Sequence, residues 1–209
     1  MAGMTRYDMI EKIKTEKNDC RRVFCTNGKN IKQRKERRAE CTVSREKQIR
    51  VAVITSSDSG YRGEREDLSG PAIRKIVEAA GDRVVFYRIL PDDRKLLAEE
   101  MARLADSGEA DLILTTGGTG FSPRDIMPEA TLDIGERQVP GIPEAMRAYS
   151  MQFTPRAMLS RAASVIRRRT LIINLPGSPK AVGECLEYIY PQLEHGIDIL
   201  TGRTGNCAR

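Results

Sequence analysis

The stretch Leu112-Ile113-Leu114-Thr115-Thr116-Gly117-Gly118-Thr119-Gly120-Phe121-Ser122-Pro123-Arg124-Asp125 decides the fold. A short apolar run that is bounded by glycines is typical of a buried strand. The glycines permit a tight turn and let a ligand approach the bare main chain. Threonine hydroxyls and freed N–H groups can bind an anion, and the carboxylate of Asp125 can hold a metal ion. The same residues also suit an ordinary strand-to-helix turn, so this stretch alone leaves both interpretations open.

Strand and helix signals alternate around this stretch. Apolar runs at 51–55, 84–90 and 111–115 predict strands, and apolar residues at helical spacing predict helices at 72–80 and 96–107. This alternation is typical of a three-layer α/β sandwich with a mostly parallel central sheet and helices on both faces.

The last third of the chain continues the pattern. We expect a hairpin of 163–166 and 170–174, with its first strand at a sheet edge, around the turn Arg167-Arg168-Arg169. These arginines are either solvated or in contact with an anion. A helix at 181–190 and a last helical stretch to Leu200 are expected to follow.

Composition excludes several classes of protein. No apolar run approaches the ~20 residues that span a bilayer, and no apolar N-terminal segment indicates a secretory signal. The five cysteines are odd in number and irregularly spaced, which argues against a disulfide framework. We therefore expect a cytoplasmic protein with no membrane contact.

The net charge of +6 comes from the N-terminal segment. Residues 1–50 carry 15 Lys and Arg against 7 Asp and Glu, whereas the remaining 159 residues carry 20 against 22. Because the globular part has no overall positive field, we do not expect nucleic acid to be its partner.

Residues 1–48 are rich in Lys and Arg and poor in large apolar residues, so we expect a flexible basic extension. Three interpretations stay open: a solvated tail, an arm for nucleic acid or an anionic surface, and a contact to another module. Cys20, Cys25 and Cys41 form no Cys-x-x-Cys motif, and the single histidine, His195, lies far along the chain. We therefore expect no zinc site in the extension.

Polar loops follow four of the predicted strands, at 56–70, 91–92, 115–125 and 174–178. In parallel sheets the carboxyl ends of the strands lie at one edge, and ligands bind there. The loops should therefore meet in one site with hydroxyls, glycine amides and the carboxylates of Asp58, Asp92 and Asp125.

The chemistry of these groups suits phosphates together with Mg²⁺, which takes one or two carboxylates plus substrate phosphates. The glycine turn matches neither the P-loop nor the dinucleotide fingerprint, and no Gly-x-Ser-x-Gly elbow is present. The residues favour metal-assisted phosphoryl or nucleotidyl transfer, or the binding of a phosphate ligand.

Several motifs, in this order, resemble the molybdopterin adenylyltransferases of the MogA/MoaB type. The match covers about 50–200 and comprises Ser57-Asp58, Asp67-x-Ser69-Gly70-Pro71, Leu90-Pro91-Asp92, Thr115-Thr116-Gly117-Gly118-Thr119-Gly120, Arg124-Asp125, Pro128-Glu129-Ala130-Thr131 and Asn174-Leu175-Pro176-Gly177-Ser178-Pro179-Lys180. The resemblance implies an α/β fold, a homotrimer and transfer of AMP from ATP to molybdopterin. It also implies a partner that inserts molybdate afterwards.

The resemblance assigns roles residue by residue. Asp92 and Asp125 match aspartates that are important for activity, and we expect them to be catalytic and to hold Mg²⁺ on the triphosphate. The residues expected to bind substrate or nucleotide are Asp58, Ser69, Gly70, Thr116, Gly117, Gly118, Thr119, Gly120, Ser122, Asn174, Pro176, Gly177 and Ser178.

The expected organisation is a basic extension at 1–48, a molybdopterin-binding α/β domain at 49–201 and a tail at 202–209. The expected reaction is Mg-ATP-dependent adenylylation of molybdopterin with release of pyrophosphate. A molybdopterin-binding carrier or scaffold with the same fold and no turnover is the alternative.

Overall fold

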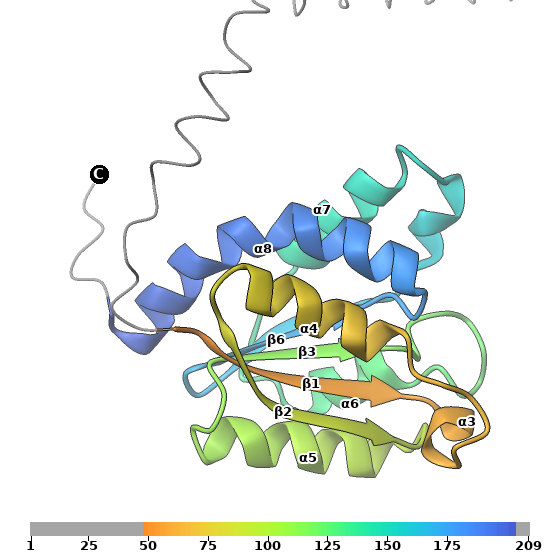
Figure 1. Cartoon of the computed structure of the whole chain (residues 1–209), viewed down its shortest axis with the longest axis horizontal. Coiled ribbons are helices and arrows are strands. Elements are labelled where there is room, and N and C mark those ends of the chain that lie inside the picture. The colour runs from red at the N-terminus through yellow and green to blue at the C-terminus, as the bar shows by residue number, and fades with distance from the viewer. Residues whose placement is uncertain (1–47, 204–209) are drawn as a thin grey trace, which may run out of the picture. The chain divides into compact units, whose positions relative to one another are not determined.

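The computed structural model describes residues 48–203, in which six strands form one sheet in the order β2-β1-β3-β6-β5-β4 (Figure 1). The four strands β2, β1, β3 and β6 are parallel, and β5 and β4 pair antiparallel at the end of the sheet. The strands are β1 (Arg50–Ser56), β2 (Arg83–Leu90), β3 (Leu112–Thr116), β4 (Arg137–Gln138), β5 (Ser164–Arg167) and β6 (Thr170–Leu175).

Helices cover both faces of this sheet, with α4, α7 and α8 on one side and α5 and α6 on the other (Figure 1). The helices are α3 (Asp58–Tyr61), α4 (Ser69–Ala79), α5 (Arg94–Asp106), α6 (Met127–Ile134), α7 (Gly141–Ser150), the 3₁₀ helix η1 (Pro155–Leu159) and α8 (Pro179–Thr201). The predicted three-layer α/β sandwich is therefore confirmed.

Each central strand is apolar on both faces because each face meets a helical layer. In β1, Val51 and Val53 belong to the cluster that contains α4 and α8, whereas Ala52 and Ile54 belong to the cluster that contains α5 and α6. All four side chains are fully buried. Burial on both sides explains why β1 and β3 are continuous apolar runs rather than alternating ones.

Two expectations about the C-terminal third are corrected. β5 is not an edge strand, because the two-residue strand β4 pairs with it through Arg137 and Gln138. The helix expected to end at Tyr190 continues as one helix, α8, through Pro191 to Thr201. Its buried residues on both sides of the proline, Ile189 and Leu193, pack in the core, and this packing outweighs the lost hydrogen bond.

Two of the three arginines at the β5–β6 turn, Arg167 and Arg168, pair with carboxylates of the protein. Arg167 binds Asp106, with an N–O distance of 2.6 Å, and donates to the carbonyl oxygen of Ile134. Arg168, at a φ of 53°, lies within 3.9 Å of Glu136. The contacts of Arg167 and Arg168 within the chain favour a structural role.

Cys185 of α8 is buried in the core as a free thiol, whereas His195 lies on the exposed side of the same helix. The expectations for the basic extension, for Cys20, Cys25 and Cys41 and for most of the tail concern residues outside the described range of 48–203. Within that range, no helix has the length and apolar character needed to cross a membrane.

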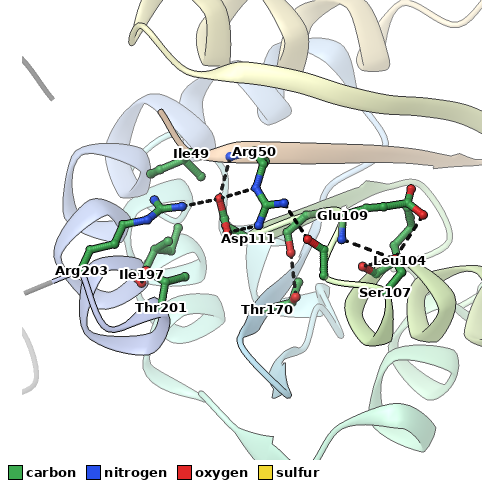
Figure 2. Close-up of polar contacts among 12 residues, drawn as sticks. Ile49, Arg50, Leu104, Ser107, Glu109, Asp111, Thr170, Ile197, Thr201 and Arg203 are labelled. Carbon is green, nitrogen blue, oxygen red and sulfur yellow. Dashed lines mark hydrogen bonds and ion pairs between the residues drawn. The ribbon is translucent and has the colours of Figure 1, made fainter. Parts of the chain in front are cut away.

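At the amino edge of the sheet, Asp111 joins the start of β1 to the end of the described chain (Figure 2). Its carboxylate is 3% exposed and accepts hydrogen bonds from the amide and guanidinium of Arg50, at 2.9 and 2.8 Å, and from the guanidinium of Arg203 at 2.7 Å. Burial alone would raise the pKa of Asp111, but these hydrogen bonds outweigh it and lower the pKa. Asp111 is therefore an anchor between two distant segments.

We expect Asp111→Asn to lower the free energy of unfolding by about 2 kcal/mol, because two guanidinium groups lose a buried carboxylate partner. Urea denaturation measures this loss. Asp106→Asn is the matched control, because Asp106 also binds two arginines but is 39% exposed. Its expected cost is much smaller than that of Asp111→Asn, because water screens an exposed ion pair.

The effect of Asp111→Asn should also depend on pH. The pKa of Asp111 is lowered in the folded state. Its contribution to the free energy of unfolding is therefore complete above the unfolded-state pKa of about 4, and it is lost as the pH falls through the folded-state pKa. The difference between wild type and variant should therefore be largest at neutral pH and decrease on acidification. Equal losses for both variants, or a difference that grows toward low pH, would contradict this account.

Candidate active site at the carboxyl edge of the sheet

The loops that leave β1, β2, β3 and β6 meet at the carboxyl edge of the sheet, as the parallel arrangement predicts. The amide of Ser57 donates to the carbonyl oxygen of Leu90, which joins the first two loops. The hydroxyl of Thr116 donates to the carbonyl oxygen of Pro176 at 2.7 Å, and that of Ser69 donates to Gly177 at 2.9 Å. These contacts bring residues that are up to 108 positions apart into one site.

Glycines at the centre of this edge allow three loops to pack against one another. Gly117 has a φ of 92°, and a Cβ there would collide with the carbonyl oxygen of Ser56. A Cβ at Gly177 would lie 3.4 Å from the Cα of Gly117. Gly118 also has a positive φ, 63°, which residues other than glycine rarely adopt. The glycine turn is therefore required by geometry, whatever it binds.

Asp58 and Asp92 connect the loop after β1 to the loop after β2 by reciprocal hydrogen bonds. The amide of Asp92 donates to Asp58 Oδ1 at 3.0 Å, and the amide of Asp58 donates to Asp92 Oδ2 at 3.2 Å. Asp92 Oδ1 accepts the hydroxyl of Ser56 at 2.5 Å. The guanidinium of Arg124 binds both oxygens of Asp58, the shortest distance being 2.7 Å. The amide of Asp92 and then Arg124 lower the pKa of Asp58, so it is ionised at neutral pH.

Asp125 closes the loop that follows the glycine turn. Its Oδ2 accepts the amide of Ser122 at 2.8 Å, whereas its Oδ1 has no hydrogen-bond partner among residues 48–203. Within this range no three His, Cys, Asp or Glu residues are grouped so that they could hold a metal ion by themselves. Asp92 and Asp125 thus follow β2 and β3, the strands on either side of β1, and do not form a complete metal cage by themselves.

Two residues expected to face the ligand use their side chains inside the protein. Asn174 is fully buried, and its amide donates to the hydroxyls of Thr115 and Thr131 while its Oδ1 accepts the amide of Ala163. Thr116, 1% exposed, donates to Pro176 as described above. Both side chains support the loops from within.

The remaining predicted residues differ in how far they are exposed to solvent. Ser122, Gly177 and Ser178 are exposed at the edge, and Gly118, Gly120 and Pro176 are partly exposed. Thr119, Ser69 and Gly70 are buried.

Asp67, which the sequence analysis named in a motif but did not choose as a site residue, anchors the start of α4. Its carboxylate accepts the amides of Ser69 and Gly70 and the hydroxyls of Thr55 and Tyr87, the last at 2.7 Å. Burial and the neighbouring Asp67 raise the pKa of Tyr87 to about 12. A Cβ at Gly70 would collide with the ring of Tyr87, so this glycine serves packing.

Arg161 is a second residue that the sequence analysis missed. It precedes β5, and its guanidinium donates to the carbonyl oxygens of Gly120 and Asp125 and to Glu129 Oε1. A single arginine in a loop carries no pattern that predicts such contacts. These contacts of Arg161 become visible only in the structure, in which it lies beside the loop at 117–126.

The arrangement defines an α/β protein in which a glycine turn and the aspartates Asp58, Asp92 and Asp125 come together at the carboxyl edge of a mostly parallel sheet. Residues 52–195 match the family described as "Probable molybdopterin binding domain". The molybdopterin adenylyltransferase of Helicobacter pylori strain 26695 is 40% identical over 156 residues, which cover 74% of this chain and 89% of that protein. The molybdopterin adenylyltransferase of Escherichia coli K12 is 38% identical over 141 residues, 66% of this chain and 72% of that protein.

Solved structures agree with these relatives. The molybdopterin biosynthesis enzyme MoaB of Thermus thermophilus is 44% identical, with a TM-score of 0.71 over 74% of this chain and 98% of that one. The tungsten cofactor synthesizing protein MoaB of Pyrococcus furiosus is 34% identical, with a TM-score of 0.67 over 74% of this chain and 98% of that one. The chain belongs to the molybdopterin-binding family of molybdenum cofactor biosynthesis, whose members include these MoaB proteins and molybdopterin adenylyltransferases.

We expect Gly117→Ala to lower the free energy of unfolding by about 3 kcal/mol, because the backbone strain of a positive φ adds to a collision with Ser56. The control is Gly81→Ala, at a φ of 84° with open space around the position. It should cost only about 1 kcal/mol. Urea denaturation of both variants separates backbone strain from collision, and equal losses would show that the loops at the site do not depend on this close approach.

Proposed function

We propose that this chain is a molybdopterin adenylyltransferase, which joins AMP from ATP to molybdopterin and releases pyrophosphate. The main support for this proposal is that the glycine turn, Asp58, Asp92 and Asp125 come together at one edge of the sheet. The chain is also 40% identical to a protein of that name. An oxygen of the terminal phosphate of molybdopterin attacks the α-phosphorus of ATP. The bond from that phosphorus to the bridging oxygen of the β-phosphate breaks, and pyrophosphate leaves.

The donor set fits Mg²⁺ as a partner of the nucleotide. Asp92 and Asp125 offer hard carboxylate oxygens, and Oδ1 of Asp125 is not engaged by residues 48–203. Mg²⁺ is usually bound by one or two carboxylates together with substrate phosphates and water, so a complete protein cage is not needed. Bound Mg²⁺ would neutralise negative charge on the triphosphate.

The residues of the chain bind and orient the reacting groups. In this proposal the main-chain N–H groups at 117–121 bind phosphate oxygens, because the glycines leave these groups accessible. Arg124, 61% exposed, is the cation that lies nearest to Asp58 and can contact a polyphosphate. Catalysis then rests on positioning and on charge stabilisation, so a general base from the protein is not required.

The proposal also includes a homotrimer in the cytoplasm that passes its product to a protein that inserts molybdate. These points rest on the resemblance to the family. Light scattering of the purified chain tests the trimer.

Asp125→Asn should lower kcat for pyrophosphate release by about a hundredfold or more, because it removes the charge that holds Mg²⁺ and orients the nucleotide. The assay follows pyrophosphate with purified protein, molybdopterin, ATP and Mg²⁺. Asp133→Asn is the matched control, since Asp133 lies on the exposed side of α6 and pairs with Arg94 there. Its kcat should stay within about twofold of the wild-type value.

Two outcomes separate the enzyme from the alternatives. Wild-type protein that binds ATP and molybdopterin but releases no pyrophosphate would be a carrier or scaffold, and the proposal would fail. Salt-sensitive binding of nucleic acid that depends on residues 1–48, without any nucleotide chemistry, would point to the basic extension as the functional part.

A further inference from the structure

Arg161 makes a set of contacts with one segment, residues 119–129, which comprises the end of the glycine turn, the loop after it and the first turn of α6. Its amide donates to the carbonyl oxygen of Thr119 at 3.0 Å, and its Nε donates to that of Gly120 at 2.7 Å. The other guanidinium nitrogens donate to the carbonyl oxygen of Asp125 and to Glu129 Oε1. The side chain is 34% exposed, so the guanidinium is partly removed from water.

These contacts fix the direction of peptide groups. In a trans peptide the carbonyl and the following N–H point in opposite directions. Because the carbonyls of Thr119 and Gly120 face Arg161, the N–H groups of Gly120 and Phe121 face away from it. Neither N–H has a hydrogen-bond partner among residues 48–203. Two adjacent amides are therefore held in one orientation with their donors unused, which is the arrangement that binds an anion.

The same side chain also contacts the main chain of Asp125. Its contact with the carbonyl oxygen of Asp125 fixes the end of the short turn in which the amide of Ser122 donates to the Asp125 carboxylate. The ring of Phe121, 69% exposed, provides little packing that could hold this turn instead. Hydrogen bonds rather than packing therefore hold this turn, namely the bond from the Asp125 amide to the carbonyl oxygen of Ser122, at 2.9 Å, and the contact with Arg161.

We propose that Arg161 is a positioning residue, which orients the N–H groups of Gly120 and Phe121 toward a phosphate group of the nucleotide and holds Asp125 in place. The inference rests on the proposed function, because it assigns a nucleotide phosphate to these amides. Arg161 itself does not contact substrate.

The test compares Arg161→Lys with Arg167→Lys. Arg167 has the same kinds of partners, the carboxylate of Asp106 and the carbonyl oxygen of Ile134. It is the last residue of β5, however, and lies at the opposite edge of the sheet, beside the start of β6. Lysine keeps the charge but cannot bind a carboxylate and two carbonyls in one plane. Both variants should therefore lose a similar amount of thermal stability.

Binding and turnover separate the two positions. We expect Arg161→Lys to raise the Kd for Mg-ATP about tenfold and to leave the Kd for adenosine within about twofold, because only the phosphate contacts are disturbed. It should also lower kcat, whereas Arg167→Lys leaves all three values near wild type. Titration calorimetry and the pyrophosphate assay give these numbers.

A second variant covers the case in which Arg161→Lys does not fold. Glu129→Gln keeps an acceptor of the same shape but weakens the charge-assisted bond to Arg161. It should raise the Kd for Mg-ATP about threefold, again without a change for adenosine.

The results distinguish this inference from the proposed function. If wild type is active and Arg161→Lys matches Arg167→Lys in Kd and kcat, Arg161 is only structural and the inference fails. If wild type binds Mg-ATP with the expected dependence on Arg161 but makes no pyrophosphate, the proposed reaction fails and the positioning role stands. If wild type does not bind Mg-ATP, both fail.

Discussion

The site depends on the close approach of the main chain at Gly117 to the carbonyl oxygen of Ser56, where no side chain fits. This approach brings the loop after β3 beside the loop after β1, and Gly177 brings the loop after β6 to the same place. The hydroxyls of Thr116 and Ser69 then fasten the loops from inside. What remains on the surface is main chain with carboxylates around it, which is suited to a phosphate ligand accompanied by a cation.

The two edges of the sheet use aspartate in opposite ways. At the amino edge, Asp82 and Asp111 are nearly inaccessible to solvent, and their oxygens bind Ile49, Arg50, Arg203 and Tyr190. These groups stabilise the fold. At the carboxyl edge, Asp58, Asp92 and Asp125 are only partly buried, and an oxygen of Asp125 is not engaged by residues 48–203. Of these three carboxylates, that of Asp125 therefore has the oxygen that is available to a ligand without loss of a contact within the described residues.

The sequence was sufficient to predict the sandwich and the edge at which the loops meet, because buried parallel strands are apolar runs and because glycine marks a tight turn. It could not predict which way a polar side chain points. Asn174 follows an apolar run as a ligand-binding residue would, yet its amide is used by Thr115 and Thr131. The two-residue strand β4 is too short for any periodicity, and the packing that carries α8 through Pro191 is tertiary.

The most direct test of the account is a crystal structure of the protein with Mg²⁺ and a non-hydrolysable ATP analogue. The account predicts the phosphates on the amides of Gly120 and Phe121, with Asp125 near the metal ion and Arg161 still bound to the carbonyl oxygens of Gly120 and Asp125. A nucleotide bound elsewhere, for example in the hollow between α5 and α6 lined by Ala98, Ala102 and Ile134, would contradict it.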